Sequence, residues 1–526
     1  MLSSARLSIA LFFGSLILFT VGLSGHEFTQ FETRFAYFAY TFSHTQFHFF
    51  PLVYGKLYPD YPASYPLLIY FFSLIFGKLN VFSAVWPSAI NAAGTVVLTY
   101  HLGARYKLSW GVSAVLFEFA TYCFLISARS LSLDMFVLFA TTLSVYLVLT
   151  KSRYYLFLPW VFIYGFVFRG PLGLVMPLAV VTGVHFVNSD YKNLIKTLLM
   201  GVFLFFLLGA LLLFCAYREG GVVFARQVMA MEMFSRVKVL GHAPFNFYLN
   251  KSFLNYALSF PVAFLVVLVN YKIFFKKTNH HEIKFLKCLL VWVLIVLGGM
   301  SIPSQKKLRY ILPMVPALSL LSGRLIVDNT SWVLAQLRSM LLKISFLFPL
   351  FGLFAIAATQ IFAFYHKMEL GGHPFWGIIF LILAFMISKY CLKLWDEKIT
   401  QYNIKLAAGV GAFMILIISM VQPIHAHANR TLLFAKILET SVQNQKIIFY
   451  KMGPDAVDIN LMLALEKSDV PLFIFEEKEL LSLPSKTIVV SYLKDYKELN
   501  EAIKKHIFLI YEGKIGHQSS VIFRKL

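Results

Sequence analysis

Three cations stand at the start of an apolar stretch in the segment SQKKLRYILPMVPAL, residues 304–318. They are Lys306, Lys307 and Arg309, and Tyr310 follows them directly. Basic side chains at a membrane boundary are commonly anchors, because their aliphatic stems lie in the apolar region while their charges reach water. The same residue types can also hold a phosphate group through charge-assisted hydrogen bonds. This stretch alone leaves both interpretations open.

Further ionisable residues stand beside apolar stretches elsewhere in the chain. Ionisable groups at the edge of a membrane cost free energy, so those that are present often have a function. Several Arg and Lys side chains with a few carboxylates at one membrane face can hold a phosphate and activate a nucleophile. The residues that fit this description are Glu32, Arg34, Asp134, Arg169, Glu232 and Arg236.

These residues also have plain structural alternatives. Glu32 and Arg34 are close enough in sequence to form a local pair on a solvated helix face. Asp134 can cap the helix that begins after SARSLSL. His44 and His48 have the i, i+4 spacing of metal ligands on a helix, but no third ligand is evident, so we expect no metal site.

The composition indicates a polytopic membrane protein. Of the 526 residues, 59% are apolar and only 14% are charged, whereas soluble chains have about 25% charged residues. A span needs about 20 apolar residues, and the apolar stretches predict an all-α membrane domain of about thirteen transmembrane helices. The net charge of +22 suits anionic lipids and basic cytoplasmic loops, and no nucleic-acid motif is present. The four cysteines lack CxxC spacing, so we expect no disulfide framework.

The chain is predicted to divide near residue 421. Residues 1–421 form the transmembrane domain, with a first outer loop over 24–83, and residues 422–526 form a small soluble α/β domain. In that tail KIIFY, LFIF, TIVVSY and IFLIY are typical of strands, with amphipathic helices over 455–467 and 497–506. Compact basic loops predict a cytoplasmic N-terminus, and an odd number of spans then places the tail outside.

The first outer loop is predicted to contain two helices. FETRFAYFAYTF has apolar and aromatic residues at helical spacing and is expected to lie at the membrane interface. Prolines in YPDYPASYP prevent a regular helix before Pro66, and a second aromatic helix is expected after it. Elsewhere, single spans are predicted near Trp110–Ile126 and Phe253–Val269.

Six segments in order resemble a known family, the C-type glycosyltransferases that use polyprenyl-phosphate sugars. The similarity is to the bacterial lipid A aminoarabinose transferases and their protein O-mannosyltransferase relatives. It covers about the first 320 residues. The segments are FETRFAYFA, YPASYPLLIYFFSLIFG, SARSLSLDMF, FRGPLGLVMP, GHAPFNFYL and SIPSQKKLRYILPMVPAL.

The resemblance implies a multi-pass enzyme of the bacterial inner membrane whose site faces the periplasm. It implies that a sugar moves from undecaprenyl phosphate to lipid A, another glycan or a protein hydroxyl, with inversion at the anomeric carbon. Membrane lipids and the lipid-linked donor are the implied partners, and nucleic acid is not among them. No cofactor is implied, and dependence on a divalent metal stays open.

The resemblance also suggests roles for individual residues. Glu32 and Asp134 are the catalytic carboxylates that it implies. Cations are needed at the departing phosphate, where negative charge develops in the transition state. The residues assigned to that phosphate are Arg34, Arg169, Lys306, Lys307, Arg309 and Tyr310. The supporting positions are Asp60, Glu232, Arg236 and His242.

This sequence departs from the family pattern at two positions. The Asp usually assigned the central catalytic role falls on Phe31, and a phosphate-binding Lys falls on or near Ser64. Either Glu32, Asp60 or Asp134 takes over the carboxylate role, or the acceptor is already ionised, as a lipid A phosphate is. A catalytically impaired polyprenyl-lipid-binding protein and a lipid-linked sugar transporter are the alternative functions.

Overall fold

The structure is a computed structural model that describes most of the chain. The described residues are 4–29, 31–60, 62–150, 153–234, 243–275, 280–328, 331–366, 374–424, 430–442, 446–453, 456–467 and 470–526.

The chain forms two compact units. The first, called here the membrane unit, comprises Met1–Val21 with Pro87–Met368 and Gly372–Val421. The second, the loop–tail unit, joins Gly22–Trp86 to Gln422–Leu526. We had grouped the first outer loop with the spans, whereas in the structure this loop and the tail form one compact unit. The reason is that side chains of the loop are buried against the tail, as described below.

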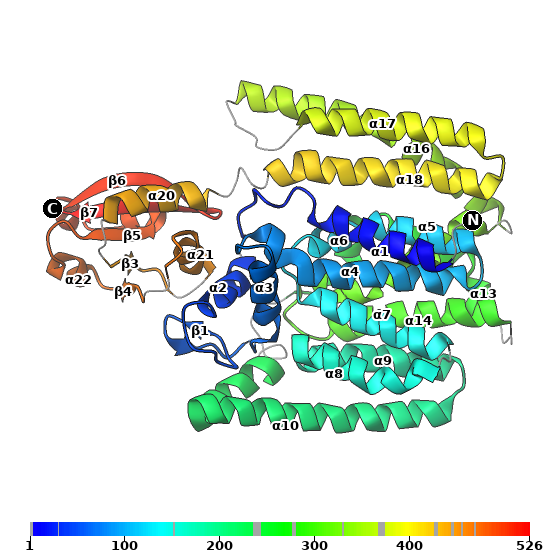
Figure 1. Ribbon diagram of the computed structural model, residues 1–526, viewed down its shortest axis with the longest axis horizontal. Coiled ribbons are helices and arrows are strands. Elements are labelled where there is room, and N and C mark those ends of the chain that lie inside the picture. The colour runs from blue at the N-terminus through cyan, green and yellow to red at the C-terminus, as the bar shows by residue number, and fades with distance from the viewer. Residues whose placement is uncertain are drawn as a thin grey trace. The chain divides into compact units, whose positions relative to one another are not determined.

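The membrane unit consists of helices (Figure 1). They are α1 (Ser4–Thr20), α4 (Val81–Ala104, shared with the other unit), α5 (Leu108–Phe119), α6 (Tyr122–Ala128), α7 (Asp134–Thr150), α8 (Leu158–Arg169), α9 (Pro171–Val187), α10 (Tyr191–Met229), α11 (Phe247–Asn255), α12 (Ser259–Val269), α13 (Tyr271–Phe275), α14 (His281–Ser301), α15 (Val315–Val327), α16 (Trp332–Tyr365), α17 (Pro374–Leu394) and α18 (Lys398–Leu416). Short 3₁₀ or π segments are η1 (Arg153–Phe157), η2 (Ala230–Phe234), η3 (Leu308–Met314) and η4 (Ile417–Val421).

Several of these helices can cross a bilayer. Within the described residues, seven are long and apolar enough, and the number rises to nine if each of two bent pairs counts as one span. Five further apolar helices are shorter than 18 residues. The polytopic α-helical class is therefore confirmed, while the count of about thirteen spans stays a prediction.

Two stretches predicted as single spans are broken in the structure. α5 and α6 meet at a bend of 75°, and α11 and α12 meet at 112°. At the first break the Thr121 hydroxyl donates to the Phe117 carbonyl at 2.9 Å and lies 2.6 Å from the Ser259 hydroxyl. Side-chain oxygens thus satisfy polar groups where the backbone leaves the regular helix, which a membrane interior requires.

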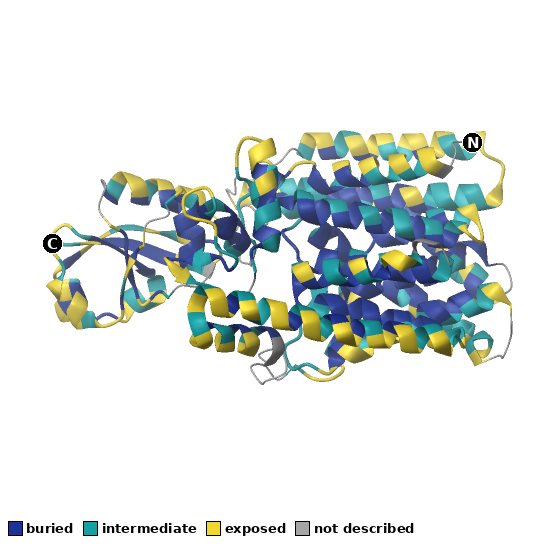
Figure 2. Cartoon of the chain, turned by 60° about the horizontal axis from the view of Figure 1, so that its bottom comes forward, coloured by how far each residue is buried: buried dark blue, intermediate teal, exposed yellow. Residues whose placement is uncertain are grey.

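The outer helices carry exposed apolar side chains, and the inner ones do not (Figure 2). In the most apolar windows of Tyr191–Glu232 and Pro374–Leu394 only 17% of residues are buried, against 89% in Leu308–Val327. Exposed apolar residues on a spanning helix are those that contact lipid. The segment that follows Lys306 and Lys307 therefore lies largely in the protein interior, whereas Lys307 itself is exposed.

The loop–tail unit combines two helices of the loop with an α/β fold of the tail. The loop provides α2 (Phe31–Thr41), α3 (Ser64–Ile75) and the strands β1 (Leu52–Val53) and β2 (Lys56–Leu57). The helices of the tail are α20 (Thr431–Val442), α21 (Ala456–Ala464), α22 (Glu477–Ser482), α23 (Leu493–Lys497) and α24 (Glu501–Lys504). Both predicted loop helices are present, and α3 begins close to Pro66 as expected.

The sheet of the tail has the strand order β4-β3-β5-β7-β6. β3 (Ile448–Tyr450) is parallel to β4 (Leu472–Ile474) and to β5 (Ile488–Tyr492). β7 (Gln518–Lys525) lies antiparallel between β5 and β6 (Ile507–Ile515). The four predicted strands are confirmed, and β7 is an additional strand.

The loop and the tail are joined by buried polar contacts. The Tyr54 hydroxyl donates to Oδ2 of Asp458 at 2.5 Å, and the Asp458 side chain is fully buried. At the start of α20, the Glu27 carboxylate accepts from the backbone N–H of Thr431 at 2.9 Å and of Leu432 at 3.3 Å. Phe35 and Phe38 of α2 are buried too, so the aromatic face that we expected at the membrane interface packs against protein.

Candidate functional site

One buried carboxylate holds two guanidinium groups in the membrane unit. Oδ1 of Asp134 accepts a hydrogen bond from Nε of Arg169 at 3.0 Å, and Oδ2 forms an ion pair with Nε of Arg309 at 2.9 Å. The side chains of Asp134 and Arg169 are 5% and 2% exposed, whereas that of Arg309 is 25% exposed. The cluster carries two positive charges against one negative charge, and its more accessible member is a cation.

Local structure brings these three residues together. Asp134 is in the first turn of α7, where a negative charge is favourable, and Arg169 is in the last turn of α8, where a positive charge is favourable. Gly170 follows with φ of +61°, and α9 begins directly after it. Gly165 of α8 and Gly173 of α9 are in close contact, so the two helices approach tightly around this turn.

Glu232 of η2 lies against the same turn. A Cβ atom on Gly170 would be only 2.8 Å from Oε2 of Glu232, and the Glu232 residue is 6% exposed. Glycine is therefore required here for two reasons, the positive φ and the close approach of a carboxylate. The structure thus places Glu232 beside the Arg169–Gly170 turn.

Tyr310 and the two lysines are close neighbours of Arg309 in the sequence. The Arg169 guanidinium lies over the Tyr310 ring, 5.6 Å from its centroid, which fixes both side chains by a cation–π contact. Nζ of Lys306 donates to the Ala243 carbonyl at 3.0 Å. Lys307 and Arg309 flank Leu308 on η3, at its N-cap and second position.

Two tyrosines that we had not predicted hold the backbone of this segment. The Tyr248 hydroxyl donates to the Lys307 carbonyl at 3.3 Å, and the Tyr256 hydroxyl donates to the Leu308 carbonyl at 2.7 Å. Both tyrosine side chains are buried. Tyr248 belongs to the GHAPFNFYL segment, so the similarity of that segment to a family motif was a signal for it, whereas Tyr256 had none.

An apolar pocket adjoins the cluster of Asp134, Arg169 and Arg309, called here the Asp134 cluster, through Tyr310. Its volume is about 220 Å³, and Tyr310 and Gln305 line one part of it. The remaining lining residues come from α9, α14 and the turn after it, and they are Leu172, Val175, Met176, Ala179, Ile295, Gly299, Met300 and Pro303. Cations next to an apolar slot suit an amphiphile that carries a phosphate on a hydrocarbon chain.

The remaining predicted residues lie in the loop–tail unit or outside the described residues. Oε2 of Glu32 accepts from the backbone N–H and the hydroxyl of Thr29, at 3.1 and 3.0 Å. The Arg34 guanidinium lies over the Tyr58 ring, 5.3 Å from its centroid. Burial raises the pKa of the Tyr58 hydroxyl, the Arg34 charge opposes this rise, and the Asp60 charge adds to it.

Arg236 and His242 lie outside the described residues. Over the described part of the chain, no group of three or more His, Cys, Asp or Glu side chains is arranged to hold a metal ion.

Sequence comparison gives limited information. No family model matches the chain. An uncharacterized protein of Aquifex aeolicus (strain VF5) is 26% identical over 364 residues, which are 66% of this chain. The chain spans 65% of the length of that relative.

Solved structures are similar over almost the whole chain. ArnT from Cupriavidus metallidurans bound to undecaprenyl phosphate has a TM-score of 0.72 at 13% identity, over 99% of this chain and 98% of ArnT. Its apo state gives 0.71 at 13% identity, with the same coverage. The oligosaccharyltransferase AglB from Archaeoglobus fulgidus, in complex with an inhibitory peptide and a dolichol-phosphate, gives 0.50 at 9% identity, over 99% of this chain and 74% of that chain.

At these identities the likeness concerns the fold. It agrees with the family resemblance predicted from six sequence segments, and the chain is a multi-pass membrane protein with the fold of ArnT.

Proposed function

We propose that this protein is a glycosyltransferase that takes a sugar from a polyprenyl phosphate, with undecaprenyl phosphate as the carrier. The single observation that carries the proposal is the Asp134 cluster, in which Arg169 and Arg309 are fixed next to an apolar pocket. A lipid phosphate has the two properties that this arrangement suits, a negative head and a hydrocarbon chain. The bound lipids named for ArnT and AglB support the same class of donor.

The proposed reaction is a single displacement at the anomeric carbon. An acceptor oxygen forms a bond to that carbon as the bond to the donor's phosphate oxygen breaks, so the configuration inverts. The polyprenyl phosphate leaves with the bonding electron pair and gains negative charge, which Arg309 and Arg169 stabilise. Lys306 and Lys307 add positive charge from the same segment.

A hydroxyl acceptor must lose its proton during the displacement, and Asp134 is poorly placed to accept it. Each oxygen of Asp134 already has a guanidinium nitrogen at 3.0 Å or less, so Asp134 acts by orienting the two cations. Glu32 and Asp60 stay the candidate bases for a hydroxyl acceptor, and an acceptor that is already ionised needs no base. Lipid A phosphate is our preferred acceptor, with another glycan or a protein hydroxyl as the alternatives, in the bacterial inner membrane with the site facing the periplasm.

Mass spectrometry of lipid A and of polyprenyl-phosphate lipids tests this proposal. Cells lacking the gene are compared with cells complemented by wild type, Arg309→Gln or Arg324→Gln. Arg324 is a matched control, since it also pairs with carboxylates in the membrane unit, at Glu282 and Asp328, away from the Asp134 cluster. We expect a glycosylated carrier to accumulate in the deletion and with Arg309→Gln, and to disappear with wild type and Arg324→Gln.

The acceptor is identified in the same experiment. Loss of a sugar-sized mass from lipid A in the deletion identifies lipid A, and an unchanged lipid A with accumulating carrier points to another glycan or a protein. An unchanged carrier pool in the deletion contradicts the transferase proposal. It favours a polyprenyl-lipid-binding or transport role, which Phe31 at the position of the family's Asp also suits.

A further inference from the structure

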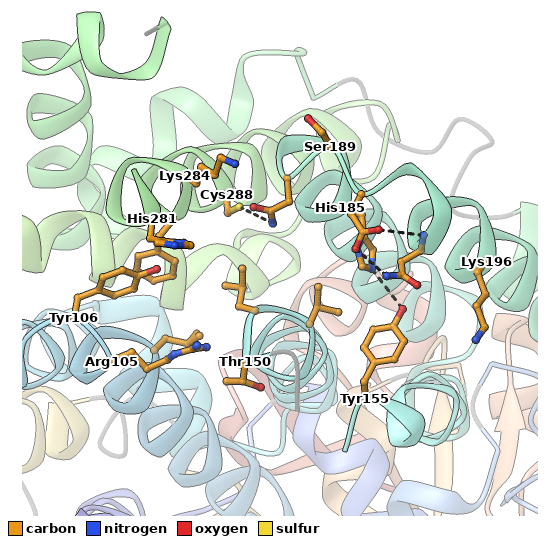
Figure 3. A pocket seen from close by; sticks show the side chains of 17 residues that line it. Arg105, Tyr106, Thr150, Tyr155, His185, Ser189, Lys196, His281, Lys284 and Cys288 are labelled. Atoms are coloured by element: carbon orange, nitrogen blue, oxygen red, sulfur yellow. Dashed lines mark hydrogen bonds and ion pairs between the residues drawn. The ribbon is translucent and has the colours of Figure 1, made fainter. Parts of the chain in front are cut away.

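A larger cavity lies at the other end of the membrane unit from Asp134. Its volume is about 900 Å³ (Figure 3). α7 begins at Asp134, and its last three residues, Val148 to Thr150, line the cavity. Sixteen residues of α-helix rise about 24 Å, so the cavity is separated from the cation cluster by most of a bilayer's apolar thickness. α9 and α14 also run from the apolar pocket at one end to this cavity at the other.

Basic side chains from separate elements of the chain line this cavity. Figure 3 shows Arg105, His281 and Lys284 on one side and His185 and Lys196 on the other. Arg105 follows α4, Lys284 is in the first turn of α14, and Lys196 is on α10. Across the described residues, no ion pair joins Arg105, Lys196 or Lys284 to a carboxylate.

Asp190 is the single carboxylate among the lining residues, and neighbours already hold it. Its Oδ2 accepts from Nδ2 of Asn193 at 2.8 Å and lies 3.5 Å from Nδ1 of His185. The Tyr155 hydroxyl lies 2.9 Å from the Thr197 hydroxyl, beside the same histidine. The cavity therefore combines unpaired positive charge with neutral hydrogen-bonding groups.

The helices that supply His185 and Lys196 to the cavity also carry apolar side chains that are exposed on the surface of the protein. Phe186, Ile195 and Leu199 are 63%, 56% and 65% exposed, and they belong to the helices α9 and α10 that line the cavity. Exposed apolar groups on membrane helices contact hydrocarbon. A ligand with a charged head and acyl chains can therefore place its head among the cations and its chains along these helices.

We propose that this cavity binds a phosphate group at the membrane face opposite the Asp134 cluster. The phosphate is held between Arg105 and Lys284 on one side and Lys196 on the other, in the manner of basic pockets between membrane helices that hold lipid headgroups. The neutral hydroxyl and amide groups suit a hydroxylated head, so phosphatidylglycerol is the lipid we choose as probe. A soluble phosphate compound has the same chemistry and is the other source. The proposal does not depend on transferase activity.

Binding is measured with the purified full-length protein in a neutral detergent, by native mass spectrometry. One arm titrates phosphatidylglycerol or, for comparison, phosphatidylcholine. The other arm titrates inorganic pyrophosphate. The test variant is Arg105→Gln/Lys284→Gln. The control, Lys107→Gln/Lys192→Gln, removes the same charge from two exposed lysines that do not line the cavity.

We expect the test variant to bind phosphatidylglycerol at least about tenfold more weakly than wild type, because each lost charge-assisted contact weakens binding severalfold. The control should stay within about twofold. The variant Arg105→Lys/Lys284→Arg keeps both charges, and its binding should resemble wild type, which separates loss of charge from loss of folding. Cavity-dependent binding of pyrophosphate without phosphatidylglycerol would identify the soluble source.

Equal weakening in the test and control variants would overturn the proposal, since it would mean that the ligand senses only the overall charge of this face. Equal binding of phosphatidylcholine and phosphatidylglycerol by wild type, with no pyrophosphate bound, would overturn it as well.

Discussion

Replacing Asp134 with Asn removes the negative charge that pairs with both Arg169 and Arg309. Arg169 then loses this carboxylate partner, although its side chain is only 2% exposed. Removing one partner of a buried ion pair costs about 3–5 kcal/mol of folding free energy. Arg309 contributes less to this cost, since its side chain is 25% exposed and water partly solvates it.

Removing Arg169 should therefore recover more of the stability lost in Asp134→Asn than removing Arg309 does. Adding Arg169→Gln to Asp134→Asn should restore about 1–3 kcal/mol, because the buried charge that lost the Asp134 carboxylate is gone. Adding Arg309→Gln should restore clearly less. The free energy of unfolding is measured by equilibrium titration with sodium dodecyl sulfate in mixed micelles, with Glu498→Gln as a control that breaks an exposed pair with Lys494.

Two results would refute this reasoning. One is a loss for Asp134→Asn as small as that for Glu498→Gln. The other is simple additivity of Asp134→Asn and Arg169→Gln, which would mean that the two side chains do not interact in the folded protein.

Three further predictions concern single residues. Gly170→Ala should lower the midpoint of thermal unfolding and weaken donor binding, because of the positive φ and of Oε2 of Glu232 at 2.8 Å from the added Cβ. Tyr54→Phe should cost about 1–3 kcal/mol and speed proteolysis of the loop–tail unit, since Asp458 loses its buried donor. Glu27→Gln should flatten the stability of this unit as pH rises above 4.5, because burial raises the pKa of the Glu27 carboxyl from 4.5.

The sign of the pH effect follows from that direction. A carboxyl with a raised pKa in the folded state favours the protonated form there, so its contribution to stability is complete below pH 4.5 and is lost as pH rises through the folded pKa. A steeper loss in the Glu27 variant than in wild type would contradict this account. Gly14→Ala, with nothing within 4 Å of the added Cβ, is the control for Gly170. Tyr496→Phe, in the same unit as Tyr54 and with its ring against Phe523, is the control for Tyr54.

Local sequence patterns predicted helices and strands better than they predicted which residues contact one another across the fold. The helix over Phe31–Thr41 and four strands of the tail were recognised from periodicity and from aliphatic runs. β7 was missed, because its first residues, Gln518 to Ser520, are polar and resemble a loop. The pairing of Tyr54 with Asp458 spans 404 residues, and no local pattern encodes it.

In the candidate site, too, the residues could be predicted from the sequence but their contacts could not. The motifs identified Asp134, Arg169 and Arg309 separately, but their mutual geometry depends on how three different elements pack. The catalytic role of Asp134 stays a prediction, and the geometry gives its carboxylate two cationic neighbours. The cavity around Lys284 was not predicted at all, since its basic residues look like ordinary loop charges in the sequence.

The union of the first loop with the tail has a consequence for biosynthesis. Tyr54 emerges from the ribosome long before Asp458, which is 404 positions later in the chain. At about 5–20 residues per second this stretch takes roughly 20–80 s to make. During that interval the aromatic side chains of α2 lack the surface that later buries them. The nascent loop therefore needs protection, by a chaperone or by the lipid surface, until the last fifth of the chain has been translated.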